Sequence, residues 1–365
     1  MRVCPQCDRR AWLLAELSIQ LDFKARELAR LWPLLELPDA ELIEALGGRR
    51  REELRATYAE WKPSTANTGE EEQAICRHHV AYPESLRNEG LAPHALSIRG
   101  GIERLTAILD EPVVAIVGTR RASDYGMETA RGLARGLGAS GVTIASGLAE
   151  GIPSAAHAGA LEAHGKTVTV MAGKLERCSP ASCRALYRRI ADSGCALSET
   201  LSSVRSHSWW HPGRARTLAL LADLVIVVEA REHPWELACA HVAQAHEKIV
   251  AAVPGRVSSS ASKGANGLLV RGSPLVRNPQ DALDLLYGVG VRDAEDPPIQ
   301  ASSLEPRLRG VLERVGDGRN TVAKLSEQGT LSGEVVIALA ELELLGLLVR
   351  GDGGRYLCSA GALSS

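Results

Sequence analysis

The sequence predicts an α/β protein built on a Rossmann-like, doubly wound and mostly parallel sheet, with a small N-terminal helical domain and a C-terminal winged-helix-like domain. Short β-branched apolar runs alternate with helical segments between residues 113 and 253. Each run ends in turn residues such as glycine, serine or proline. Because ligands bind outside the carboxyl ends of strands in such a sheet, these turns predict one ligand-binding rim.

The core elements follow from this alternation. A short continuous apolar run is typical of a strand buried on both faces. Strands are expected at 113–117, 143–145, 167–171, 195–198, 224–228 and 248–253, and helices near 125–140, 153–164, 180–192, 214–222 and 234–246.

The flanking segments have a different character. Residues 1–62 show helical apolar spacing, and two polar, turn-rich stretches separate this segment and the chain's end from the core. The expected domains are 1–62 (helical), 63–74 (linker), 75–287 (Rossmann-like core), 288–303 (linker) and 304–365 (winged-helix-like).

The C-terminal segment predicts three short helices followed by a β-hairpin, which is the winged-helix pattern. The helix in the position of a recognition helix carries Glu334, Glu341 and Glu343 and no basic residue. Insertion of such a helix into a negatively charged groove is costly, so we interpret this module as a protein-interaction or self-association element.

Composition restricts the functional classes. The 365 residues are 45% hydrophobic and 24% charged, which is ordinary for a globular protein, and the net charge is −2. Any affinity for nucleic acid must therefore come from local arginine clusters, not from a basic domain. No apolar run approaches the length of a membrane span and the amino terminus lacks a signal-peptide core, so we expect a cytoplasmic protein without a membrane partner.

Two turns carry the chemistry of an anion site. The first strand is followed by Gly118, Thr119, Arg120 and Arg121, and the second by Ser146-Gly147. Glycines let the backbone approach an anion, helix N-termini present free N–H groups, and arginine offers a planar fork of donors for phosphate. These residues predict phosphate binding at the rim, although a solvated turn remains the alternative for the arginines.

Four separated motifs together are specific to one family. They are GTRRASDYG from Gly118, SGLAEGI from Ser146 followed by Ala156-His157, AVPG from Ala252, and KGANGLL from Lys263. Their order and spacing over 83–286 resemble the DNA-processing protein A family (DprA, also called Smf). The resemblance implies a non-enzymatic, dimeric protein that binds single-stranded DNA and loads a RecA-type recombinase during natural transformation.

The same resemblance implies further DNA-binding residues. They are Lys174 after the third strand, Trp210, Arg214 and Arg216 in the segment WWHPGRAR, and Asn266 in the KGANGLL motif. Trp209 or Trp210 could stack a base, or they could pack in a hydrophobic corner. The chain departs from the family pattern at Pro153, Cys183, Ala215 and Pro234-Trp235, the last of which replaces a glycine-containing element.

Two other functions compete with DNA binding. One is a nucleotide phosphoribohydrolase on a related Rossmann-like fold, and the other is a sensor of small nucleotides. The sequence has no GxGxxG fingerprint after a strand, no P-loop and no GxSxG elbow, and His157 is expected to be a structural helix residue. We therefore expect no catalytic residues.

Eight cysteines are scattered through the chain, and a cytoplasmic setting disfavours disulfides. Cys4 and Cys7 have the spacing of a zinc knuckle, and Cys76 with His78 could complete a tetrahedral site. The alternative is a redox-inert cysteine pair. The sequence thus predicts no required cofactor for DNA binding and a candidate structural zinc ion.

Overall fold

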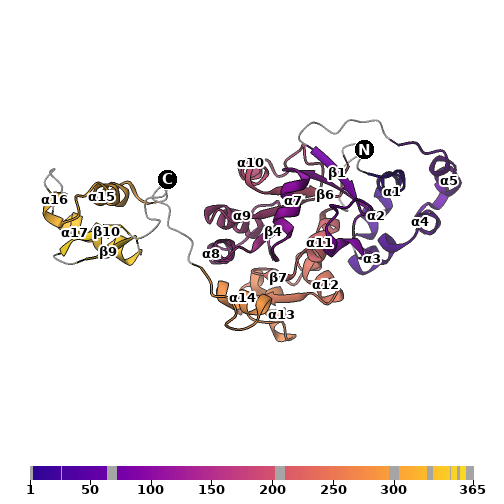
Figure 1. Ribbon diagram of the computed structural model, residues 1–365. Helices are drawn as coiled ribbons and strands as arrows, with labels where there is room; N and C mark the ends of the chain where they lie inside the picture. Colours follow the sequence, from indigo (N-terminus) through magenta and orange to yellow (C-terminus); the bar gives the residue numbers. More distant parts are fainter. Residues whose placement is uncertain are drawn as a thin grey trace. The chain divides into compact units, whose positions relative to one another are not determined.

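The computed structural model describes residues 3–25, 27–63, 72–201, 210–295, 304–326, 332–345, 347–351 and 354–358. The chain divides into two compact units, residues 1–295 and 296–365 (Figure 1). Within the described residues, no helix is long and apolar enough to cross a membrane.

An eight-stranded sheet organises the first unit, in the order β1-β2-β6-β5-β4-β3-β7-β8. The six strands from β3 to β8 are mutually parallel, and β1 and β2 extend the β6 edge in antiparallel fashion. The strands are β1 (Glu72–Cys76), β2 (Ala95–Arg99), β3 (Val113–Val117), β4 (Thr143–Gly147), β5 (Thr167–Met171), β6 (Cys195–Ser198), β7 (Leu224–Val227) and β8 (Ile249–Ala252). The predicted doubly wound, mostly parallel fold is confirmed.

Alternation along the central strand builds two separate cores. Val113, Ala115 and Val117 of β3 belong to one buried cluster, whereas Val114 and Ile116 belong to another. This is the two-residue period of a strand whose faces are both covered. The continuous apolar run that predicted β3 therefore fills both sides of the sheet.

Helices cover both faces (Figure 1). On one face lie α8 (Asp124–Ala139), α9 (Ile152–Glu162) and α10 (Arg184–Ser193). On the other lie α11 (Trp210–Leu221) and α12 (Ala238–Ala245). The remaining helices of the core are α6 (Glu84–Arg87), α7 (Ile102–Leu109), α13 (Lys263–Val270) and α14 (Pro279–Tyr287).

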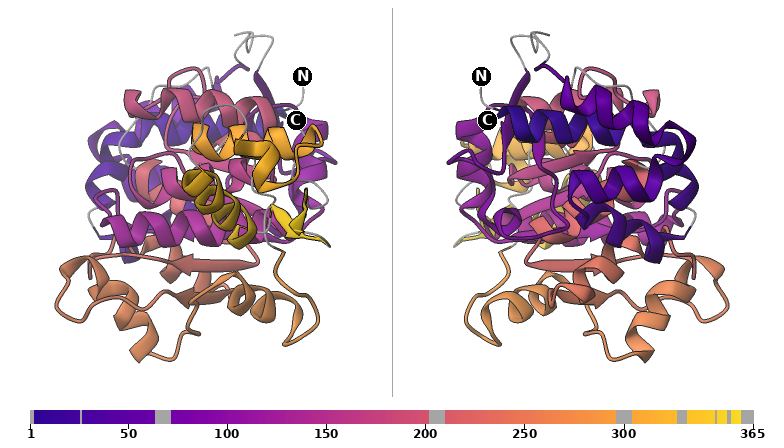
Figure 2. Two further views of the ribbon diagram at one scale, coloured as in Figure 1. Left: turned by 90° about the vertical axis from the view of Figure 1, so that its left-hand side faces the viewer. Right: turned by 90° about the vertical axis from the view of Figure 1, so that its right-hand side faces the viewer.

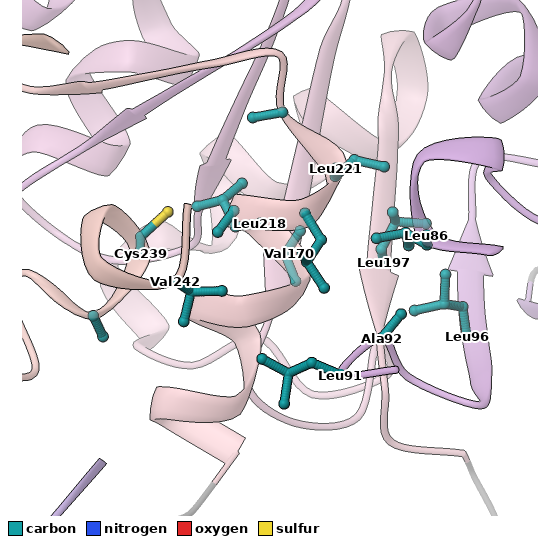
Figure 3. Close-up of a cluster of buried hydrophobic side chains, with 14 of the residues drawn as sticks. Leu86, Leu91, Ala92, Leu96, Val170, Leu197, Leu218, Leu221, Cys239 and Val242 are labelled. Carbon is teal, nitrogen blue, oxygen red and sulfur yellow. The ribbon is translucent and has the colours of Figure 1, made fainter. Parts of the chain in front are cut away.

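The core behind α11 and α12 reaches the antiparallel edge of the sheet. Figure 3 shows Leu218 and Leu221 of α11 in one cluster with Val170 of β5, Leu197 of β6 and Leu96 of β2. Burial of such side chains stabilises a fold by about 1.5–3 kcal/mol each. The α11 helix is therefore held firmly, which matters because it carries site residues.

The N-terminal helices pack on the same side as α11, and the right-hand view of Figure 2 shows them in front of the sheet. They are α1 (Pro5–Glu16), α2 (Ser18–Lys24), α3 (Leu28–Glu36), α4 (Asp39–Leu46) and α5 (Arg51–Ala59). The buried Arg10 guanidinium donates to Asp39 Oδ1 at 2.6 Å and to the Leu35 carbonyl at 2.8 Å. The leucines of these N-terminal helices belong to the same buried cluster as residues of the sheet. The predicted domain boundary near residue 62 stays a prediction.

The edge strands are the main addition to the predicted topology. β1 begins at Glu72, inside the stretch expected to be a linker, and it pairs with β2 from Glu72↔Arg99 to Cys76↔Ala95. β1 is only partly buried and mixes polar with apolar residues, so it lacks the apolar run that predicts a central strand. The core was thus expected to begin later than it does.

The second unit consists of α15 (Pro306–Gly316), α16 (Val322–Ser326), α17 (Ser332–Leu344), β9 (Leu348–Arg350) and β10 (Tyr356–Cys358). The two strands are antiparallel, and Leu312, Leu339 and Leu342 lie in a core of the unit's own. This is the predicted order of three helices and a hairpin. The winged-helix interpretation itself stays a prediction.

Candidate nucleic-acid interface

A pocket of about 440 Å³ opens at the carboxyl ends of β3 and β4. Its position is the switch point of the sheet, because the chain runs from β3 to β4 on one side and β7 lies on the other side of β3. Its lining includes Gly118, Thr119, Arg120, Arg121, Ser146, Gly147, His211, Arg214, Arg231, Trp235 and Glu236. Seven residues predicted from the sequence therefore meet at one site.

The loop after β3 is fixed by backbone contacts. The Thr119 amide donates to the Glu229 carbonyl at 2.6 Å. A Cβ atom at Gly118 would lie 2.5 Å from the same carbonyl oxygen and 2.7 Å from Ile152 Cγ1, so only glycine fits there. The next two residues, Arg120 and Arg121, are exposed at the pocket.

The carboxylate of Glu229 holds the far end of this loop. Its Oε1 accepts from the Ser123 hydroxyl at 2.6 Å, and its Oε2 accepts from the Ser123 amide at 2.9 Å. The Ser123 hydroxyl oxygen in turn accepts from the Gly126 amide at 3.1 Å and caps α8. Sequence reasoning missed this role, since Glu229 stands out only as an acidic residue directly after a strand.

Arg214 is the central cation of the pocket. It projects from the first turns of α11, its side chain is half-buried, and a Cβ atom at Gly147 would lie 2.9 Å from its Cζ. Its Nη1 donates weakly to the Leu148 carbonyl at 3.4 Å, and no carboxylate of the described residues pairs with it. Burial, followed by repulsion from Arg120, lowers the pKa of Arg214 to about 10. The guanidinium thus remains charged at neutral pH and has no carboxylate counterion within the part of the chain that the structure describes.

His211 lies beside Arg120, and the charge of Arg214 also reaches it. Arg120 Nη2 is 3.4 Å from His211 Nδ1. Burial and the charges of Arg214 and Arg120 lower the pKa of His211 to about 4, so its imidazole is neutral at pH 7. The positive charge of this part of the pocket therefore comes from arginine.

Trp235 stands at the same pocket with 45% of its surface exposed. Its amide donates to His233 Nδ1 at 3.3 Å, and the nearby Arg231 amide donates to Glu236 Oε2 at 2.7 Å. The sequence marked this position as a departure from the family pattern. In the structure, its aromatic ring lines the same pocket as the arginines. The signal available in the sequence was a tryptophan that follows soon after a predicted strand.

Three predicted residues lie outside this pocket lining. Asn266 forms a reciprocal pair of hydrogen bonds with the backbone of Gly255, both at 3.0 Å. Lys174 follows β5 and is half-buried. Burial raises the pKa of Glu72, and the positive charge of Lys174 acts in the opposite direction. Arg216 is 3% exposed, pairs with Glu199 and donates to the Leu91 carbonyl.

Ser146 lines the pocket, but its hydroxyl donates to the Ile116 carbonyl at 2.6 Å. Trp210 begins α11, and its side chain, like the whole of Trp209, lies outside what the structure describes. His157 is fully buried against Thr167 Oγ1 at 2.8 Å, which supports its structural interpretation.

A larger cavity of about 810 Å³ lies beside β1, β2 and α10. Its lining includes Arg99, Arg104, Arg177, Arg184 and Arg188. Arg104 Nη1 is engaged by the carbonyls of Ala191 and Asp192 at the end of α10. We place the candidate site in the smaller pocket, because only that one lies at the switch point and contains the predicted strand-end residues.

The four predicted metal ligands also come together. Cys4, Cys7, Cys76 and His78 each direct one ligand atom into a cluster whose atoms lie within 4.8 Å of one another. His78 Nδ1 is 3.3 Å from Cys4 Sγ and 3.5 Å from Cys7 Sγ. None of the four residues of this Cys/His cluster lines the pocket of the arginines, and thiols with an imidazole are ligands for a metal ion and not for phosphate.

Known proteins share this fold and much of this sequence. The putative DNA processing protein DprA of Mycobacterium tuberculosis is 37% identical over 252 residues, which cover 68% of this chain and 65% of that protein's length. Protein Smf of Escherichia coli is 32% identical over 303 residues, covering 78% of this chain and 79% of that protein.

Two solved structures are similar. DNA processing protein A from Streptococcus pneumoniae has a TM-score of 0.62 at 25% identity and covers 79% of this chain and 99% of that one. DNA processing protein A from Helicobacter pylori, which binds single-stranded DNA, has a TM-score of 0.52 at 28% identity and covers 59% of this chain and 95% of that one.

The family model described as DNA recombination-mediator protein A matches residues 73–287, from β1 to the end of α14. That range includes the loop after β3, the glycine at the end of β4 and the start of α11. The chain therefore belongs to the DNA recombination-mediator protein A family.

Proposed function

We propose that the pocket at the switch point binds the phosphate backbone of single-stranded DNA. The observation that carries this proposal is the half-buried guanidinium of Arg214, which faces the pocket without a carboxylate partner among the described residues. A buried charge without a counterion is costly, and an anionic ligand offsets that cost. Phosphate suits a guanidinium because two parallel hydrogen bonds can form.

The surroundings of Arg214 favour a polymer over a single phosphate group. Arg120, Arg121 and Arg231 lie exposed around the same pocket, so several successive phosphates could be neutralised. The exposed face of Trp235 would stack one base, a contact worth about 1–3 kcal/mol. Bases are free to stack in this way only when the strand is single.

Family membership supports a finer functional proposal. The protein would act as a recombination mediator that loads a RecA-type recombinase onto incoming single strands in natural transformation, in the cytoplasm and as a homodimer. The Helicobacter pylori relative that binds single-stranded DNA supports the first step of this role. The acidic α17 supports assigning the second unit to protein interaction, because Glu334, Glu341 and Glu343 would repel DNA.

We further propose that binding involves no turnover and no required cofactor. Cys239 is the thiol in the pocket lining, and burial raises its pKa to about 12, so it stays protonated. His211 is neutral at pH 7, and its Nδ1 lies 3.4 Å from Arg120 Nη2. A phosphoribohydrolase or a small-nucleotide sensor is the rival function.

Fluorescence anisotropy with single- and double-stranded oligonucleotides, at several salt concentrations, tests the proposal. We expect tighter binding of the single strand and an affinity that falls steeply with salt. Mononucleotides should compete weakly. Equal competition by a mononucleotide would support the sensor, and release of a free base from a nucleoside monophosphate would support the hydrolase.

A further inference from the structure

We propose that Cys4, Cys7, Cys76 and His78 bind one structural zinc ion that fastens the N-terminal helices to the edge of the sheet. This site is independent of the proposed DNA-binding pocket. Cys4 and Cys7 flank the start of α1, Cys76 is the last residue of β1, and His78 follows it. The ligand set of three thiols and one imidazole is one that structural zinc sites use.

The distances between the ligand atoms match a tetrahedral zinc site. With zinc–sulfur bonds of about 2.3 Å and zinc–nitrogen bonds of about 2.0–2.1 Å, a sulfur and a nitrogen ligand lie about 3.6 Å apart. In the structure, His78 Nδ1 lies 3.3 Å from Cys4 Sγ and 3.5 Å from Cys7 Sγ. All four ligand atoms lie within 4.8 Å of one another, so little movement is needed to bind the ion.

The backbone around the cluster also suits thiolate ligands. The Cys4 amide points at Cys76 Sγ at 3.5 Å, an N–H to sulfur contact that stabilises negative charge on the sulfur. Pro5 occupies the first position of α1 and fixes the turn between the two cysteines of the Cys-x-x-Cys pair. The ligands are therefore held by a helix start and a strand end, not by loose side chains.

Burial points to a structural role. Cys7 and Cys76 are 0% and 2% exposed, whereas Cys4 is half-buried and His78 is exposed. The ion would thus lie between the buried Cys7 and Cys76 and the protein surface. Four protein ligands would fill its coordination shell and leave no position open for a substrate. Structural zinc sites have this closed coordination, and catalytic sites keep one position for water.

The position of the cluster explains what the ion would do. Cys4 and Cys76 are 72 residues apart, and all of the helices α1 to α5 lie between them. Binding would close this whole segment into a loop anchored on β1. Zinc-binding free energy becomes folding free energy when the site forms only in the native state. Loss of zinc should therefore loosen the N-terminal segment first.

The test begins with the metal content of full-length protein purified under reducing conditions without an affinity tag that binds metals. We expect about one zinc per chain. Exchange for cobalt should give the visible absorption bands of a tetrahedral thiolate site. Less than a tenth of an equivalent of zinc, with no cobalt spectrum after addition of the metal, would overturn the proposal, as would a stable Cys4–Cys7 disulfide in protein purified without reductant.

Variants separate metal binding from misfolding. His78→Ala should lose most of the zinc, and His78→Cys should keep it with a cobalt spectrum shifted toward four sulfur ligands. Because His78 is exposed, both variants should fold. Cys178→Ser is the matched control, since Cys178 is half-buried but outside the cluster, and it should retain a full equivalent. Equal zinc content in wild type and His78→Ala would contradict the assignment. Oligonucleotide binding by zinc-free protein would leave the DNA-binding proposal standing.

Discussion

The guanidinium of Arg214 packs directly over the backbone of Gly147: a Cβ atom at that glycine would lie 2.9 Å from Arg214 Cζ. The glycine ends β4, and the arginine comes from the first turns of α11. Two segments far apart in sequence thus set the position of the one half-buried cation in the pocket. Glycine at 147 leaves room for the guanidinium to lie flat against the strand end.

Gly147→Ala should weaken binding of single-stranded DNA about tenfold, or ~1.4 kcal/mol. The added methyl group would displace the tip of a flexible side chain, so the fold should be retained. Anisotropy titration measures the affinity, and thermal unfolding checks the fold. Gly132→Ala on α8 is the control, because a Cβ atom there meets nothing within 4 Å. Unchanged affinity in a folded Gly147→Ala protein would show that the position of Arg214 is unimportant.

Trp235→Ala should cost about 1–3 kcal/mol of binding free energy for single-stranded DNA, whereas Trp235→Phe should retain most of it. The reason is that stacking needs an exposed aromatic face, and Trp235 is 45% exposed at the pocket. The measurement is an affinity series with the two variants at one salt concentration. If Phe and Ala weaken binding equally, the indole does not act by stacking.

Glu229→Gln should destabilise the protein by about 1–3 kcal/mol, because a carboxylate that accepts two hydrogen bonds from Ser123 is lost. DNA binding should also weaken, since the loop bearing Arg120 is held at both ends by residue 229. Urea unfolding measures the first effect. Glu232→Gln, at an exposed neighbouring position, should change neither quantity. Equal stability of the two variants would show that the hydrogen bonds of Glu229 do not stabilise this loop.

Stability should fall as the pH drops from 6.5 toward 4, in part through His157. Burial lowers the pKa of His157 from 6.5 to about 4 in the folded state. Between these two values the imidazole is protonated in the unfolded chain but neutral in the native state. The stabilisation is therefore complete above pH 6.5 and is lost progressively as the pH falls from 6.5 to about 4. The effect is on the order of a few kcal/mol.

His157→Gln should flatten the dependence of unfolding free energy on pH between 4 and 6.5, whatever its effect at pH 7. A remaining slope is expected from His94, whose pKa burial lowers to about 3. Unfolding by urea at a series of pH values measures the slope. An identical slope in wild type and variant would mean that His157 titrates normally.

Much of the fold could be predicted because its central strands are continuous apolar runs. β3, β5 and β6 have the predicted bounds, and the switch point follows from strand order once the sheet is known. β1 and β2 were missed as strands because β1 mixes polar and apolar residues and stands at an edge. The turn residues at Gly118 and Gly147 were predictable because strand ends must meet at one edge.

Side-chain direction was harder to predict than position. Arg214 and Arg216 are two residues apart on one helix, a spacing that places them on different faces. One faces the pocket, and the other pairs with Glu199. The helical spacing already contained this signal. Other contacts join segments that no local sequence pattern links. They are the paired hydrogen bonds between Asn266 and the Gly255 backbone, and the hydrogen bond from Ser123 to Glu229.

The most direct test of the account is the salt dependence of single-stranded DNA binding in the double variant Arg120→Ala/Arg214→Ala. If each guanidinium neutralises one phosphate, the slope of log affinity against log salt concentration should shrink by about 1.4 relative to wild type. Arg131→Ala/Arg277→Ala removes the same charge from exposed ion pairs, one on α8 and one just before α14, and should leave the slope nearly unchanged. A wild-type slope and affinity in the first variant would contradict binding at this pocket.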